Sequence, residues 1–144
     1  MSENRKKKGI VILILLLVAA AVFYFFYSKK QGIYLPSSIQ GSSTISEGEI
    51  KLKIWDNNTE DGDSVKVYVD DELIRDTLPL LYEPLQLNFG RLSKGEHLLT
   101  VAAINEGMTA PASATMGISN GTEIIEFEMN ATMDSVAAWK IFIK

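Results

Sequence analysis

Two hydrophobic patterns divide this chain. Residues Ile10–Tyr27 form an unbroken apolar run, IVILILLLVAAAVFYFFY, without a charge, a proline or a glycine. A helix of this length is roughly 27 Å long, which matches the hydrocarbon thickness of a bilayer. From Glu49 onward, apolar and polar residues alternate instead, as in Ile50, Leu52 and Ile54. Alternation with period two places one face of a strand in a core and the other in water. The pattern therefore predicts one membrane-spanning helix followed by an all-β domain.

The alternation continues to the last residues and is divided by turn signals. Such signals occur at Asp70-Asp71, Lys94-Gly95 and Asn120-Gly121, and the last of these is typical of a two-residue hairpin. The strands are expected at Ile50–Ile54, Val65–Val69, Leu85–Phe89, Leu99–Ala103, Ala112–Ile118, Glu123–Met129 and Ala137–Ile143. Seven or eight short strands in residues 49–144 predict a small immunoglobulin-like antiparallel β-sandwich.

The charges that flank the apolar run predict its orientation. Arg5, Lys6, Lys7 and Lys8 precede the run, whereas only two lysines follow it directly. Because basic residues favour the cytoplasmic side, residues 1–9 are expected to form a cytoplasmic tail and residues 10–27 a signal-anchor. The chain would then be a single-pass inner-membrane protein whose C-terminal domain lies in the periplasm. The alternative is a signal peptide cleaved after Ala21, which would release the domain as a secreted protein.

Residues 28–48 separate the predicted anchor from the alternating segment. They are rich in serine and glycine, contain Pro36, and carry few charges. This composition is typical of a flexible linker. The expected organisation is thus a tail, an anchor, a linker and one extracytoplasmic β-sandwich over residues 49–144.

Charge and residue usage exclude several classes of function. The chain carries a net charge of −4, divided between +5 in residues 1–30 and −9 in the remainder. An acidic domain of this kind argues against a nucleic-acid partner. The absence of cysteine excludes disulfides, thiol catalysis and thiolate metal sites. His97, the one histidine, stands beside Glu96 at a strand start and is expected at the surface. No nucleophile motif or phosphate-binding loop is present, so the sequence predicts a protein that is not an enzyme and requires no cofactor.

The densest polar cluster lies between the first two predicted strands. Carboxylate and amide oxygens around a glycine turn are the ligands that Ca²⁺ prefers, so this loop is a candidate calcium site. The candidate ligands are Asp56, Asn58, Glu60, Asp61 and Asp63. The same residues also suit a solvated turn whose side chains bond their own backbone. Both interpretations stay open.

Four further residues are candidates for binding. Asn105 and Glu106 follow a long apolar strand, where they either form a turn or approach the acidic loop to complete a polar site. Trp55 and Tyr68 occupy the polar phase of their strands and are expected to face solvent. Exposed aromatic side chains can stack on sugar rings or anchor a protein partner, although they also serve to cover a sheet.

Part of the chain resembles a known kind of domain. The motif formed by Trp55, Asp56 and Glu60–Asp63, followed by Gly95 and Leu98 and by Ala103 with Asn105–Gly107, is similar to small extracytoplasmic β-sandwich domains of Bacteroidota envelope and secreted proteins. Those domains favour an asparagine where this chain has Glu96-His97, and P-P-N-T where it has Ala110–Ser113. The resemblance covers most of residues 49–144 and implies an extracytoplasmic accessory domain of uncharacterised function.

These observations lead to three functional hypotheses. The first is a membrane-anchored, non-catalytic β-sandwich that binds or scaffolds an envelope protein partner. The second is a Ca²⁺-dependent or carbohydrate-binding module that uses the acidic loop or the exposed aromatics. The third is a small hydrolase, which would require a nucleophile or a carboxylate pair in a cleft. If cleavage occurs after Ala21, the domain is instead released as a secreted protein.

Overall fold

The structure is a computed structural model that describes residues 12, 14–22 and 37–144. The chain divides into two compact units, residues 1–32 and 33–144. In the first unit, residues 12 and 14–22 are helical, and the side chains described there are exposed. None of the helical residues described belongs to a helix long and apolar enough to cross a bilayer. The predicted tail, both ends of the predicted anchor and residues 28–36 of the predicted linker fall outside the described residues.

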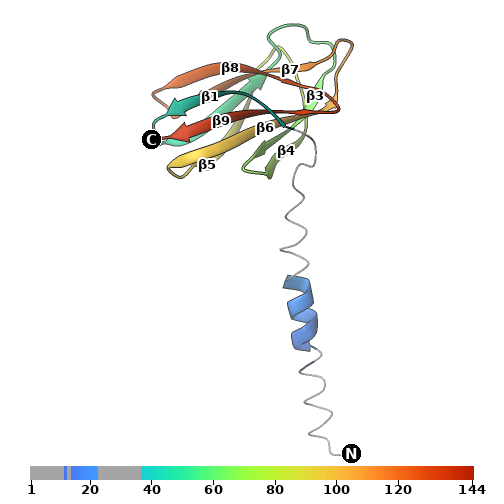
Figure 1. The fold of residues 1–144 in the computed structure, drawn as a ribbon, viewed down its shortest axis with the longest axis vertical. Coiled ribbons are helices and arrows are strands. Elements are labelled where there is room, and N and C mark those ends of the chain that lie inside the picture. The colour runs from blue at the N-terminus through green and yellow to red at the C-terminus, as the bar shows by residue number, and fades with distance from the viewer. Residues whose placement is uncertain (1–11, 13, 23–36) are drawn as a thin grey trace, which may run out of the picture. The chain divides into compact units, whose positions relative to one another are not determined.

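The second unit is built from strands, as the alternating pattern predicts (Figure 1). In the described part of this unit the strands are β1 (Ser37–Ile45), β2 (Glu49–Trp55), β3 (Ser64–Val69), β4 (Glu72–Pro79), β5 (Leu85–Arg91), β6 (Gly95–Asn105), β7 (Ala112–Ser119), β8 (Ile124–Ala131) and β9 (Val136–Ile143).

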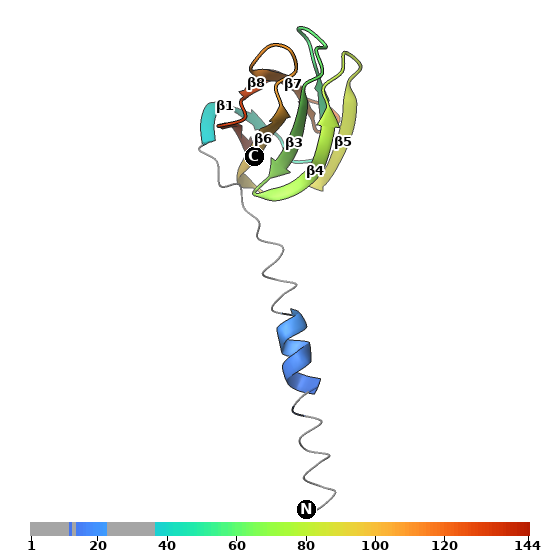
Figure 2. The same cartoon turned by 90° about the vertical axis from the view of Figure 1, so that its right-hand side faces the viewer.

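The strands form two sheets that pack as a sandwich (Figure 2). One sheet has five strands in the order β1-β9-β6-β3-β4, and the other has four in the order β5-β2-β7-β8. Only the β3–β4 and β7–β8 connections join neighbours in one sheet, and every other connection crosses to the opposite sheet. The fold is therefore all-β, and most of its loops run across the ends of the sandwich.

The predicted alternation is confirmed in the strands that form the core. Along β2 and β3, buried residues alternate with more exposed ones. The buried positions supply Ile50, Leu52 and Ile54 from one sheet and Val65 and Val67 from the other. Burial of such a side chain contributes about 1.5–3 kcal/mol.

Two of the predicted turns join neighbouring strands of one sheet. Asp70 and Asp71 form a two-residue turn between paired Val69 and Glu72, with φ of 50° and 64°. Aspartate tolerates this left-handed conformation better than most residues, and the right-handed twist of a hairpin requires it. The second hairpin is longer than predicted, because Ser119 pairs with Ile124 and residues 120–123 form its loop.

The prediction that residues 28–48 form a linker, with the domain starting at residue 49, is wrong for β1. Ser37–Ile45 is a full strand, and it pairs with β9 in parallel, so the sheet is not purely antiparallel. Its unusual composition has a packing reason. The Trp139 ring lies directly against Gly41, and the Trp139 indole N–H donates to Ser43 Oγ at 3.0 Å. Glycine at position 41 therefore leaves room for the Trp139 ring, and serine at position 43 accepts its N–H. The β4 strand, which the Asp70-Asp71 turn predicts after β3, extends to Pro79, and most of its residues are exposed.

β1 also contacts the opposite sheet. The Gln40 side-chain amide donates to the Asn130 carbonyl at 2.7 Å and accepts from its N–H at 2.8 Å. Trp139 stacks on Phe127 of β8 with ring centroids 4.1 Å apart. At the other end of the strand, the Glu123 carboxylate accepts from the Ser46 N–H and hydroxyl, each at 2.8 Å. β1 thus closes one side of the sandwich.

We predict that Gly41→Ala destabilises the domain, because a Cβ at this position would overlap the Trp139 ring. Overpacking of this kind costs about 1–3 kcal/mol. Urea unfolding followed by tryptophan fluorescence measures the difference. Ser42→Ala, at the exposed neighbouring position, is the control and should have little effect. Equal stability of the two variants would contradict the assigned packing.

Candidate functional site

The acidic loop and the loop after β6 meet at one end of the sandwich. Residues 56–63 connect β2 to β3, and residues 106–111 connect β6 to β7. The Asp61 carboxylate joins them, since its Oδ2 accepts from the Met108 N–H at 3.0 Å and the Thr109 N–H at 2.8 Å. Between the loops lies a cavity of about 110 Å³. Its lining consists of Asp56, Asn58, Thr59, Asp61, Asp63, Thr109, Ala110, Pro111 and Ser113. We call this region the acidic end.

Asp56 holds the start of the acidic loop. Only 2% of the residue is exposed, and its Oδ1 accepts from the N–H groups of Asn58 at 2.7 Å and Thr59 at 3.0 Å. This is the local side-chain turn that one interpretation of the sequence expected. The Asp56 N–H donates to the Leu81 carbonyl at 2.8 Å. The loop is therefore fixed both to itself and to the segment that follows β4.

Asp63 is the most perturbed carboxylate of the acidic end. It is 3% exposed, and its Oδ2 accepts a long hydrogen bond of 3.3 Å from the Ser113 N–H. Burial raises the pKa of Asp63 to about 6, and the negative charges of Asp61 and Asp56 act in the same direction. Asp63 Oδ1 and Asp61 Oδ1 are both buried and have no hydrogen-bond partner. Two carboxylate oxygens at this site therefore have no hydrogen-bond donor among the described residues.

The five predicted calcium ligands separate into two groups. Asp56, Asn58, Asp61 and Asp63 line the cavity. Glu60 is not among the lining residues, and its Oε2 accepts from the Tyr82 N–H at 2.8 Å. Within the described part of the chain, no three acidic or histidine side chains are arranged to hold a metal ion. A role of these residues in binding calcium stays a prediction.

Asn105 and Glu106 also accept hydrogen bonds from backbone N–H groups. The Asn105 side chain accepts from the Gly107 N–H at 3.0 Å and donates to Ser64 Oγ at 2.6 Å. Glu106 Oε1 accepts from the Met133 N–H at 2.6 Å. Neither Asn105 nor Glu106 is among the residues that line the cavity, and the contact between the two loops is made by Met108 and Thr109. Asn105 forms a turn, and the loop that it begins contacts the acidic loop through Asp61.

Trp55 and Tyr68 lie on different sheets. Each is half-buried and alternates with core residues, so Trp55 lies on the outer face of the four-stranded sheet and Tyr68 on that of the five-stranded sheet. The Trp55 ring packs on Gly117, where an added Cβ would lie 3.4 Å from the nearest ring carbon. The two aromatic residues therefore cannot form a single binding surface.

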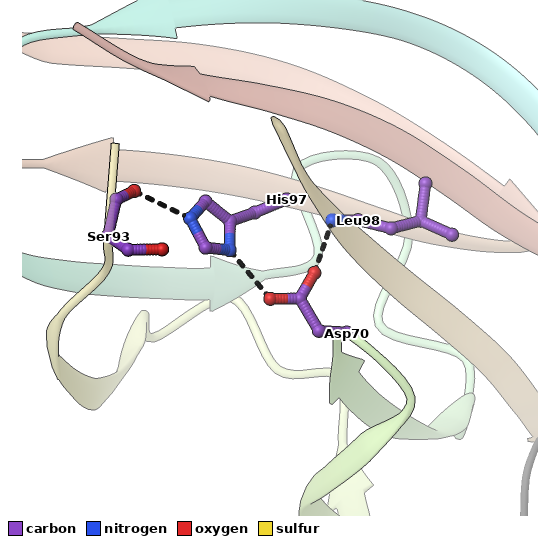
Figure 3. Close-up of polar contacts among 4 residues, drawn as sticks. All are labelled: Asp70, Ser93, His97 and Leu98. Atoms are coloured by element: carbon purple, nitrogen blue, oxygen red, sulfur yellow. Dashed lines mark hydrogen bonds and ion pairs between the residues drawn. The ribbon is translucent and has the colours of Figure 1, made fainter. Parts of the chain in front are cut away.

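The sequence analysis did not predict that His97 is buried and paired with Asp70. His97 is 8% exposed, so its predicted surface position is wrong. Its Nδ1 lies 2.6 Å from Asp70 Oδ2 and its Nε2 lies 2.8 Å from the Ser93 carbonyl oxygen (Figure 3). Both ring nitrogens face acceptors, so a protonated imidazolium satisfies both contacts. Burial alone lowers the pKa of His97, but the bonds to Asp70 and Ser93 outweigh it and raise the pKa.

The strand pattern contained a signal for this burial. His97 is in phase with Leu99 and Val101, both of which are core residues. Its partner could not be found from spacing, because Asp70 belongs to the β3–β4 turn. Asp70 Oδ1 also accepts from the Leu98 N–H at 2.9 Å, which fixes this turn against β6 (Figure 3).

We predict that stability falls as pH rises through the pKa of folded His97. The folded pKa lies above the unfolded one, so the contribution is complete below the unfolded value of about 6.5 and disappears above the folded one. The loss should be on the order of 1 kcal/mol, because Asp70 is partly exposed.

Urea midpoints of the wild type and of His97→Gln, measured from slightly acidic to alkaline pH, check this prediction. The variant should be less stable in acid and should lose the His97 part of the pH dependence, whereas the part from Asp63, whose pKa is raised to about 6, should remain. Asp71→Asn, at the second residue of the same turn, is the control. A variant with an unchanged pH profile would show that His97 is neutral in the folded protein.

Neither a protein-family model, nor a curated protein, nor a solved structure matches this chain. The resemblance to Bacteroidota envelope domains therefore stays an expectation from its motifs.

Proposed function

We propose that this chain is a membrane-anchored, non-catalytic β-sandwich that binds or scaffolds a protein partner in the cell envelope, outside the cytoplasm. The apolar run at residues 10–27 with its basic flank supports the anchor. The acidic loop supports a non-catalytic role, since most of its carboxylates accept backbone N–H groups.

A groove at the β4–β5 side carries this proposal. The groove has a volume of about 450 Å³, and its lining is Arg75, Thr77, Leu78, Pro79, Leu81, Glu83, Pro84 and Leu85. Leu81 is 43% exposed, Leu85 40%, and neighbouring Tyr82 57%. Exposed apolar side chains gathered at a polar-rimmed groove mark a protein interaction surface, and buried aromatic residues contribute most to such interfaces.

The groove lies where two sheet edges meet. β4 ends one sheet and β5 ends the other, and residues 80–84 connect them (Figure 2). Edge strands offer unpaired backbone groups to an added strand. A partner that inserts an apolar side chain between Leu81 and Leu85 would also reach these groups.

The acidic loop fixes one wall of the groove. The Leu80 N–H donates to the Asp63 carbonyl at 2.9 Å, and the Tyr82 N–H donates to Glu60 Oε2 at 2.8 Å. The Asp56 N–H also donates to the Leu81 carbonyl. The acidic loop therefore bonds three successive residues, 80–82. Preorganisation of this kind lowers the entropic cost of binding.

We predict that a photo-crosslinking amino acid in place of Tyr82 forms a discrete product with an envelope protein in cells. Leu85→Asp should abolish it, because a charge in an apolar contact costs roughly a tenfold or greater loss of binding. The control is the same amino acid at Ile124, which is 73% exposed on the opposite edge of the four-stranded sheet. Equal products at both positions, or none at Tyr82, would contradict the groove as the interface.

The anchor has a separate test. The intact chain should remain in membranes after alkaline extraction, and its domain should be accessible to protease only from outside the cytoplasm. Mass spectrometry of the mature protein decides between anchoring and release. A mature chain that begins after Ala21 and is free in solution would establish the secreted alternative.

One observation favours carbohydrate binding as a second candidate. Gly117, on which the Trp55 ring packs, is part of the lining of a hollow of about 180 Å³ on the four-stranded sheet, whereas Trp55 itself is not in that lining. Lys51, Lys53, Gln86, Ser119, Ile124 and Glu126 complete its lining. Amide, ammonium and carboxylate groups beside an aromatic ring suit a sugar.

For this second candidate, Trp55→Ala should abolish binding to a glycan array. Tyr68→Ala is the matched control, because Tyr68 lies on the other sheet. Binding that both variants retain, or no binding by the wild type, would exclude this face as a sugar site.

A further inference from the structure

Two carboxylate oxygens at the acidic end point to a missing ligand. Asp61 Oδ1 and Asp63 Oδ1 are buried without a hydrogen-bond partner. Both approach Gly107, where an added Cβ would overlap Asp61 Oδ1 and lie 2.6 Å from Asp63 Oδ1. Gly107 has φ of +58°, so a side chain is disfavoured there on both counts. The two oxygens therefore face the same small region, with no protein donor between them.

The charge around these oxygens is not balanced by the protein. The cavity is lined by the carboxylates of Asp56, Asp61 and Asp63, and no Lys, Arg or His is among the described residues of its lining. The remaining polar groups of the lining are the hydroxyls of Thr59, Thr109 and Ser113 and the amide of Asn58. Such a set is rich in oxygen donors, which hard divalent cations prefer over soft metals.

We propose that Asp61 and Asp63 bind one hydrated divalent cation, Ca²⁺ or Mg²⁺, with Asp56 contributing a third negative charge. Water supplies the other ligands, which agrees with the absence of a third carboxylate or histidine ligand among the described residues. With so few protein ligands the affinity should be in the millimolar range of extracellular modules.

The cation would also act on the groove. Asp63 and Asp56 bond the backbone of Leu80 and Leu81 through their main-chain groups. A cation that holds the two aspartates would fix this wall of the groove. This consequence rests on the proposed function, whereas cation binding itself does not.

A shared proton is the competing explanation for the two oxygens. One protonated carboxyl could donate to the other, and this arrangement would need no cation. The two explanations differ in their response to Asp63→Asn. An asparagine amide can replace a shared proton by donating to Asp61 Oδ1, but it removes a charge that a cation requires.

The experiment is a thermal unfolding titration of the full chain in detergent micelles at neutral pH. About 10 mM CaCl2 or MgCl2, compared with EDTA, should raise Tm by about 5 °C or more. The shift should be lost in Asp61→Asn and Asp63→Asn and retained in Glu49→Gln, which removes one exposed charge elsewhere. Isothermal titration of the wild type should show one cation per chain. A response to Ca²⁺ alone indicates direct coordination, and an equal response to Mg²⁺ indicates binding through water.

Two outcomes would overturn the proposal. One is the absence of a shift with either cation, and a higher Tm of Asp63→Asn would then identify a proton-sharing pair. The other is a shift that both aspartate variants retain, which shows a nonspecific salt effect. The Tyr82 crosslink, measured with CaCl2 and with EDTA, tests the link to the groove. Cation binding without a crosslink would refute the proposed function alone, and a crosslink without cation binding would refute this inference alone.

Discussion

Carboxylates that accept backbone N–H groups are the interaction on which this fold depends. Most connections cross from one sheet to the other, so their N–H groups leave the sheet ladders and need other acceptors. A buried N–H without an acceptor costs about 1–3 kcal/mol. Side-chain carboxylates accept N–H groups of these connections at Asp56, Glu60, Asp61, Glu106 and Glu123. Asp63 and Asp70 accept instead from the strand residues Ser113 and Leu98. The acidic composition of the domain is thus partly a property of its topology.

This role also explains why the acidic end is a candidate site. A carboxylate has more acceptor capacity than one or two N–H groups can satisfy. Asp61 uses one oxygen for two donors and keeps the other buried without a partner. Asp63 does the same beside it with a single long bond. The excess negative charge arises from fixing the loops, and a cation would neutralise it at the place where two loops and the groove wall meet.

The sequence predicts the strands in which apolar and polar residues alternate strongly. It does not predict a strand whose residues are determined by contact with a distant side chain. Alternating valines and isoleucines predict β2 and β3 correctly, because burial alone decides those positions. β1 was missed because Gly41 and Ser43 are selected by contact with Trp139, which lies far along the chain. Only Ile45 of that strand reaches the core.

The candidate site was predicted in part for the same reason. Asp56 could be assigned to a local turn because its partners are two and three residues away. The contact of Asp61 with Met108 and Thr109 depends on which loops meet at one end of the sandwich, and strand spacing does not contain this information. For His97 the sequence did contain the information. Its phase with Leu99 indicated burial, but its polarity suggested the surface, and the structure shows it buried.

The parallel pairing of β1 with β9 has a consequence for biogenesis. β1 has no other neighbour in its sheet, and β9 is the final strand of the domain. A polypeptide that crosses a membrane from its N-terminus would deliver β1 first and its partner last. The sheet therefore cannot be completed until residues 136–143 have been delivered. Such long-range pairing slows folding and leaves the edge of an early strand unprotected until β9 is available.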